Sequence, residues 1–238
     1  MDCSSVTCGA RRPWLPTIAH VQPLVSVLIP WRRGAQDRER SFRVVKHHWL
    51  KNHPTYRIVI RDSGGEPFSR ACSINMAAQS EPDAQVFVIA DADVVPVPAQ
   101  VEAAVELALQ APGIVQPFDR YIPLHKWDTA EVWDRGVVPD VMADRPIAHW
   151  ECISGCLVLS RESWETVGGF DERFRGWGYE DSAFDQKMAS IVAPRRSVPG
   201  PAWHLAHVGF IPDAAVDPQS QANRALFEQY QLDYPCPK

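Results

Sequence analysis

Three short stretches of the sequence combine residue types that bind metals, accept protons or stack on flat ligands. IADADVVP (89–96) ends an apolar run in two aspartates one residue apart. WHLAHVGF (203–210) carries two histidines three residues apart. FRGWGYEDSAF (174–184) places a tryptophan between two glycines and follows it with adjacent acids. Read together, these stretches contain the residue types for a metal site and for a carboxylate that accepts a proton.

The aspartates and histidines favour a metal. Asp91 and Asp93 repel each other unless a cation or hydrogen-bond donors lie between them, although aspartate also commonly starts turns. Neutral imidazole, as in His204 and His207, suits borderline transition metals, whereas Mg²⁺ prefers oxygen. A histidine pair by itself is more often structural. The combined oxygen and nitrogen set favours Mn²⁺.

The glycine-rich stretch has two interpretations. Gly176 and Gly178 would allow a tight turn that leaves the Trp177 ring exposed as a platform for a sugar or a base. Glu180 or Asp181 would then take a proton from an acceptor hydroxyl. Alternatively, the tryptophan is buried and the acids only complement the dipole at a helix start.

The surrounding pattern predicts an α/β domain. Apolar, β-branched runs alternate with segments of helical length, which indicates βαβ crossovers and a parallel sheet. Ligands of such sheets bind at the carboxyl ends of the strands, where the aspartates fall. We expect strands at 24–30, 56–62, 84–93 and 156–160 and helices at 37–52, 66–80, 98–110, 161–169 and 182–191.

Composition narrows the function class. The 238 residues suit one domain, and the net charge of -5 argues against a general nucleic-acid coat. Residues 32–61 are nevertheless basic, with nine Lys or Arg against two acids, which keeps phosphate or DNA contacts open. The six cysteines have no C-x-x-C spacing, and no signal peptide or membrane anchor is evident. A cytoplasmic protein with free thiols is expected.

Several motifs, in order from about 24 to 210, resemble GT-A glycosyltransferases, particularly the β-1,4-galactosyltransferase group and related bacterial and phage enzymes. GGFDERFRGWGYEDSAF (168–184) is similar to the family signature G-W-G-x-E-D. The resemblance implies a single GT-A domain with a mostly parallel central sheet flanked by helices. It assigns Trp177, Gly178 and Glu180 to acceptor binding and Asp181 to catalysis as the base.

The resemblance also implies a donor site and a metal site. VLIPWR (27–32) and PFSRACSINMAAQ (67–79) are similar to the family's nucleotide-binding segments, although Ser69 replaces the usual Asn. Asp93, His207 and His204 become the metal ligands, with His204 standing where vertebrate members carry Met. The expected donor-binding residues are Pro30, Trp31, Arg32, Asp62, Phe68, Arg70, Asp91, Cys152 and Gly155.

The expected reaction is metal-dependent, inverting transfer of Gal, GalNAc, Glc or GlcNAc from a UDP-sugar to a hydroxyl on a glycan, a protein or a modified DNA base. Mn²⁺ is the expected cofactor and Mg²⁺ the alternative. Other readings are a noncatalytic sugar-binding homologue and a metal-dependent nucleotidyltransferase or phosphohydrolase. We expect a lead-in (1–23), a nucleotide-binding half (24–97), an acceptor and catalytic half (98–210) and a C-terminal tail or lid (211–238).

Overall fold

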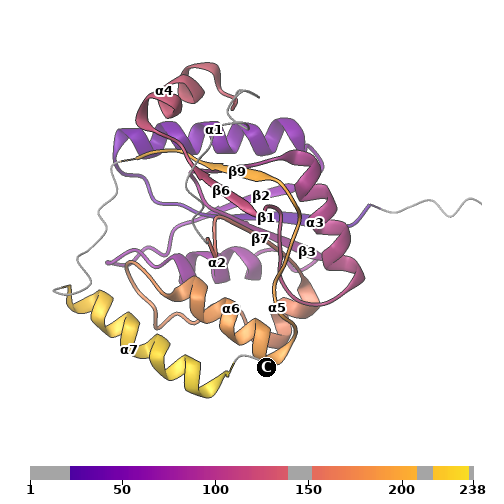
Figure 1. The fold of residues 1–238 in the computed structure, drawn as a ribbon, viewed down its shortest axis with the longest axis vertical. Coiled ribbons are helices and arrows are strands. Elements are labelled where there is room, and N and C mark those ends of the chain that lie inside the picture. Colours follow the sequence, from indigo (N-terminus) through magenta and orange to yellow (C-terminus); the bar gives the residue numbers. More distant parts are fainter. Residues whose placement is uncertain (1–21, 139–151, 208–216, 236–238) are drawn as a thin grey trace, which may run out of the picture.

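The computed structural model describes residues 22–138, 152–207 and 217–235. Most of the predicted lead-in, the first part of the predicted tail, and Cys3, Cys8 and Cys236 lie outside these ranges. The described chain forms a six-stranded sheet in the order β2-β1-β3-β7-β5-β8 and a three-stranded sheet in the order β4-β9-β6. Helices α1 and α2 cover opposite faces of the larger sheet (Figure 1).

The first three strands are parallel, as the alternating pattern predicts. β1 (Val25–Pro30) lies between β2 (Arg57–Arg61) and β3 (Val86–Ala90). Every residue of β1 and β3 is buried, which is why both read as continuous apolar runs. The carboxyl ends of the three strands therefore meet at one edge of the sheet.

The other half of the sheet is mixed. β7 (Cys156–Ser160) pairs antiparallel with β3 and with β5 (Val115–Gln116), and β8 (Arg196–Ser197) runs parallel to β5. The predicted parallel arrangement thus holds on one side of β3 only. The direction of β7 was not evident from the sequence because no regular strand–helix–strand unit leads into it.

The smaller sheet was not predicted, and it joins distant segments. β4 (Val94–Pro96) pairs antiparallel with β9 (Pro201–His204), which runs parallel to β6 (Arg120–Pro123). Val94 lies opposite His204, and the backbone N–H of Leu205 donates to the Asp93 carbonyl at 2.8 Å. This pairing brings the D-x-D segment next to the histidines.

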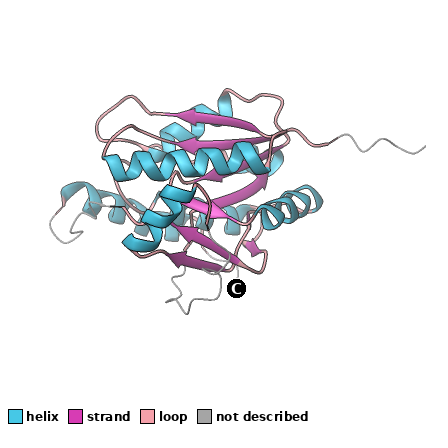
Figure 2. Ribbon diagram, turned by 90° about the horizontal axis from the view of Figure 1, so that it is seen from above, coloured by secondary structure: helices cyan, strands magenta, loops and turns pink. Residues whose placement is uncertain are grey.

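Seven helices are described: α1 (Gln36–Asn52), α2 (Arg70–Gln79), α3 (Pro98–Gln110), α4 (Lys126–Arg135), α5 (Arg161–Val167), α6 (Glu180–Ile191) and α7 (Pro218–Asp233). The bounds of α3 agree with the prediction, whereas α4 and α7 were not predicted. Figure 2 shows α1 lying along one face of the sheet. α7 packs on α6 through a small core of Phe174, Ala183 and Tyr230. Within the described residues, no helix is long and apolar enough to cross a membrane.

Candidate active site

Asp93, His204 and His207 form a cluster that could hold a metal. One ligand atom from each residue lies within 4.8 Å of the others. His207 Nε2 is 3.2 Å from Asp93 Oδ2, and His204 Nε2 is 3.8 Å from Asp93 Oδ1. Burial would raise the pKa of Asp93, but the hydrogen bond from His207 and the two imidazoles hold it below its ordinary value. An ionised carboxylate with two imidazoles is a donor set that fits Mn²⁺.

The other aspartate of the D-x-D segment faces a different partner. Asp91 Oδ1 accepts hydrogen bonds from Arg70 Nη2 at 2.7 Å and Nε at 2.9 Å. Its backbone N–H donates to the Gly155 carbonyl at 2.9 Å. Burial raises the pKa of Asp91 to about 6, against the opposing effect of Arg70. The two aspartates diverge because they lie in the turn between β3 and β4 and not within one strand.

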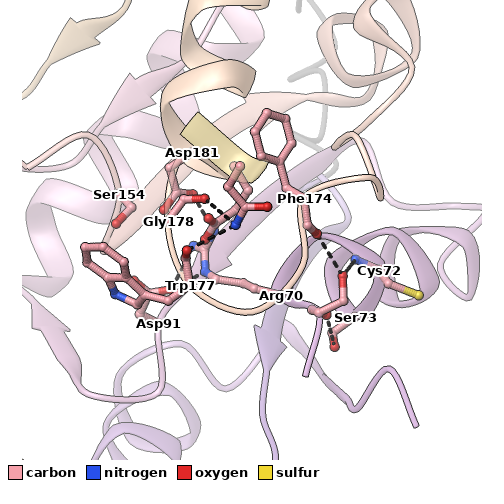
Figure 3. A network of polar contacts seen from close by, with 12 residues as sticks. Arg70, Cys72, Ser73, Asp91, Ser154, Phe174, Trp177, Gly178 and Asp181 are labelled. Atoms are coloured by element: carbon pink, nitrogen blue, oxygen red, sulfur yellow. Dashed lines mark hydrogen bonds and ion pairs between the residues drawn. The ribbon is translucent and has the colours of Figure 1, made fainter. Parts of the chain in front are cut away.

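Arg70 links this turn to the first turn of α6. Its guanidinium pairs with Asp181 and lies 3.8 Å from Glu180 Oε1 as well as contacting Asp91 (Figure 3). Burial alone would lower the pKa of Arg70, but the carboxylates of Asp181, Asp91 and Glu180 raise it. Burial and the neighbouring Asp181 raise the pKa of Glu180 to about 7. One partly buried cation therefore lies close to three carboxylates at the site.

The Trp177 turn is exposed and sharply bent. Gly176, Gly178 and Tyr179 have φ values of 67°, 97° and 72°, in the left-handed region. The Trp177 side chain is 48% exposed, which disagrees with the buried-tryptophan interpretation. Glu180 does lie in the first turn of α6, but it also lies within ion-pair distance of Arg70. The turn therefore presents a flat apolar ring beside partly buried carboxylates.

A cavity of about 870 Å³ opens at this turn. Its wall includes the predicted base Asp181, all three predicted acceptor residues and three of the nine predicted donor residues: Trp177, Gly178, Glu180, Phe68, Arg70 and Cys152. Arg38, Ser154 and Gln219 line it as well and were not singled out from the sequence. Arg38 appeared only as one residue of the basic 32–61 segment, and Gln219 lies beyond the resemblance. Asp91 and the metal cluster do not line the cavity, but Arg70, which does, contacts Asp91, two residues before Asp93 of the cluster.

Four other predicted donor residues, Pro30, Trp31, Arg32 and Asp62, lie at the ends of β1 and β2. Pro30 ends β1, and the Trp31 ring stacks on Phe42 with 4.4 Å between centroids. Arg32 Nε lies 2.9 Å from Asp62 Oδ2, and its Nη1 is 2.8 Å from Glu66 Oε1. Arg32 and Asp62, which were each predicted to contact the donor nucleotide, pair with each other in the structure.

Gly155 and Cys152 connect the cavity to the metal cluster. Gly155 has φ 86°, and a Cβ there would lie 3.2 Å from the Tyr121 ring. The same Tyr121 ring stacks on His204 with 5.5 Å between centroids. Cys152 lies at the cavity wall, where burial raises the pKa of its thiol to about 11. Tyr121 belongs to β6, so only the unpredicted second sheet brings it to the site.

Comparison with known proteins agrees with this architecture. A family model described as the N-terminal domain of galactosyltransferase matches residues 142–198. The catalytic domain of Drosophila β1,4-galactosyltransferase 7 in complex with xylobiose superposes with a TM-score of 0.60 at 16% identity, covering 85% of this chain and 80% of that one. No curated protein matches the sequence.

Two further structures have the same fold. A variant of the Drosophila enzyme in complex with manganese, UDP-Gal and xylobiose has a TM-score of 0.56 at 15% identity, covering 84% of this chain and 79% of that one. Glucosyl-3-phosphoglycerate synthase of Mycobacterium tuberculosis, with phosphoglyceric acid, has a TM-score of 0.51 at 15% identity, covering 91% and 81%. The predicted GT-A fold is confirmed. Together, the family match and the fold confirm the resemblance to GT-A glycosyltransferases and support the prediction that the chain is a glycosyltransferase enzyme.

Proposed function

We propose that the protein is a metal-dependent, inverting glycosyltransferase that moves a hexose or N-acetylhexosamine from a UDP-sugar to an acceptor hydroxyl. The observation that carries this proposal is the bridge made by Arg70. It connects Asp181, beside the exposed Trp177 turn, to Asp91, two residues before the metal-site Asp93. A proton acceptor, a sugar platform and a metal site thus belong to one connected site.

Asp93, His204 and His207 would hold Mn²⁺. The three side chains are 15%, 26% and 19% exposed, so the ligand atoms are partly shielded from water. Burial lowers the pKa of His204, which keeps that imidazole neutral and able to ligate. A bound Mn²⁺ would supply charge neutralisation for the two phosphates of a UDP-sugar.

Arg38 supports the same donor position. Its guanidinium lies 5.7 Å from the centre of the Trp31 ring, and the residue lines the cavity. Arg38 also lowers the pKa of Asp93, so its charge acts at the metal cluster. Arg32 and Arg70 are each engaged with two or more carboxylates, whereas no ion pair joins Arg38 to another described residue. We assign phosphate binding to Arg38 and a supporting role to the other two arginines.

Asp181 is the proposed base. It would take the proton of the acceptor hydroxyl while that oxygen attacks the anomeric carbon from the face opposite the leaving phosphate. The ion pair with Arg70 orients the carboxylate. Trp177 and Glu180 would bind the acceptor on the cavity wall, so that the hydroxyl and the base meet in one orientation.

The two alternative functions, a noncatalytic sugar-binding protein and a nucleotidyltransferase or phosphohydrolase, would each leave some of these residues without a role. A noncatalytic sugar-binding protein needs neither a metal cluster nor a buried base. A nucleotidyltransferase or phosphohydrolase could use the metal cluster, but it has no use for an exposed tryptophan beside a proton acceptor. The expected acceptors remain a glycan, a protein or a modified nucleic acid.

Product analysis tests the proposal. UDP release is measured from UDP-Gal, UDP-GalNAc, UDP-Glc and UDP-GlcNAc, with Mn²⁺, with Mg²⁺ and with chelator, and with xylobiose and other sugars as acceptors. We expect metal-dependent release of UDP that Asp93→Ala abolishes and Asp83→Ala, an exposed control before β3, preserves. In a parallel incubation with UTP and sugar 1-phosphates, release of pyrophosphate would identify a nucleotidyltransferase. Absence of both turnover and Mn²⁺-dependent UDP binding would refute the proposal.

A further inference from the structure

We propose that α7 is part of the acceptor site and that Asn223 is the residue that positions the Trp177 turn. This inference rests on the proposed function, and it extends the site beyond both the matched segment 142–198 and the resemblance over 24–210. Its basis is a set of contacts between the last helix and a turn more than 40 residues earlier in the chain.

Asn223 fastens the turn through its side-chain amide. The residue is 1% exposed, and its Nδ2 donates to the carbonyls of Arg175 at 2.8 Å and of Trp177 and Gly178 at 3.1 Å. An amide has two hydrogens, so one of them is shared between two carbonyls. Oδ1 accepts from the backbone N–H of Arg175 at 3.4 Å and from Gln219 Nε2 at 3.1 Å. One side chain therefore satisfies the backbone on both sides of Trp177.

The turn needs such support. Three of the four residues from Gly176 to Tyr179 have positive φ, and Tyr179 is the only non-glycine residue with positive φ in the described chain. An unfavourable backbone conformation of this kind persists only where several surrounding contacts hold it in place. α7 supplies a second contact there, because the Phe227 ring lies 5.5 Å from the Tyr179 ring. The same helix thus holds both the start and the end of the strained segment.

α7 also reaches the cavity itself. Asp217 and Gln219, at its first turn, line the cavity together with Trp177. A Cβ added at Gly176 would lie 3.4 Å from Gln219 Cγ, so the turn and the helix are in close contact. Loss of Asn223 would leave the three carbonyls without the donor that holds them and release the turn. The Trp177 platform would then lose its fixed orientation toward Asp181.

Two variants of Asn223 and a matched control distinguish a role in positioning the Trp177 turn from a general role in packing α7. Asn223→Ala removes the amide, and Asn223→Asp keeps its size but replaces the donor with an oxygen that faces three carbonyls. Arg224→Ala is the control, because Arg224 is the next residue on α7 and, among the residues that the structure describes, makes only an exposed ion pair with Glu228. Three quantities are measured: amide hydrogen exchange by peptide, Mn²⁺-dependent UDP binding by calorimetry, and transfer to whichever sugar in the panel accepts.

We expect faster exchange at 174–181 in both Asn223 variants and unchanged exchange at 86–96. UDP affinity should stay within about twofold of wild type, while transfer falls by about 10²-fold, the loss typical of a reacting group displaced by about 1 Å. The control should match wild type in all three measurements. In the Asn223 variants, the KM for the acceptor should also rise more than the KM for the donor.

The inference fails if the Asn223 variants exchange like wild type at 174–181. It also fails if exchange increases equally through α7 and the central sheet, since that would show a general loss of packing. The proposed function is judged separately by UDP binding and turnover of the wild-type protein. If the wild-type protein neither binds UDP nor turns over a UDP-sugar, the proposed function is refuted. The hydrogen-exchange data still decide whether Asn223 positions the turn.

Discussion

Glu180 should destabilise the protein at neutral pH, and replacing it with Gln should reveal by how much. Burial, reinforced by the charges of Asp181 and Asp91, raises the pKa of Glu180 from 4.5 to about 7. Below pH 4.5 the carboxyl is protonated in both the folded and unfolded states. Between the two pKa values only the unfolded state loses its proton, so the free energy of unfolding falls as pH rises. At about 1.4 kcal/mol per pKa unit, the full effect above pH 7 is roughly 3 kcal/mol.

Glu180→Gln removes this titration and keeps the shape of the side chain. The variant should unfold at a similar urea concentration to wild type at pH 5 and at a higher one at pH 8. The gain in unfolding free energy should grow toward 3 kcal/mol across that range. Glu162→Gln is a matched control, because Glu162 also lies in a helix first turn, that of α5, but is exposed. If the difference between Glu180→Gln and wild type did not grow with pH, the reasoning from burial would be wrong.

Three further variants test the site. Asp181→Asn should lower transfer by about 10² to 10⁴-fold, the contribution of a general base, while calorimetry shows unchanged Mn²⁺-dependent UDP binding; full activity would remove Asp181 from the base role. Arg70→Met should cost about 3 to 5 kcal/mol in urea unfolding because carboxylates that are largely shielded from water lose their partner. Arg32→Met, which breaks a more exposed pair, should cost under about 1 kcal/mol, and equal losses would contradict the burial argument. Cys152→Tyr should reduce use of UDP-GalNAc more than UDP-Gal in the donor panel, since a bulky residue fills the cavity wall; an unchanged ratio would show that this position does not select the donor.

Hydrophobic pattern was sufficient for the elements with a strong local period. The helix at 98–110 has the predicted bounds, and the strands ending near Pro30, Arg61 and Ser160 lie within a residue or two of those expected. The strand predicted at 84–93 ends earlier, at Ala90, because the D-x-D segment turns. Short strands such as β5 and β8 were missed, since two residues carry no recognisable period.

The sequence by itself determined which residue types could form the site and the order in which they occur. D-x-D, the histidine pair and the Gly-Trp-Gly turn are local patterns; the structure clusters Asp93 with the two histidines and places the Gly-Trp-Gly turn at a cavity. That part was accessible because residue chemistry and short spacing are written directly in the chain.

Tertiary structure alone decided how those residues are partnered. The β4–β9 pairing brings Asp93 to the histidines, whereas Asp91 turns to Arg70. Asn223 reaches the Trp177 turn from a helix with no motif of its own. Such contacts depend on the path of intervening segments and on which buried groups must satisfy one another, and neither has a local signature in sequence. The residue types of the site could therefore be predicted from the sequence. Their arrangement in space was set by packing between elements that are distant in the chain.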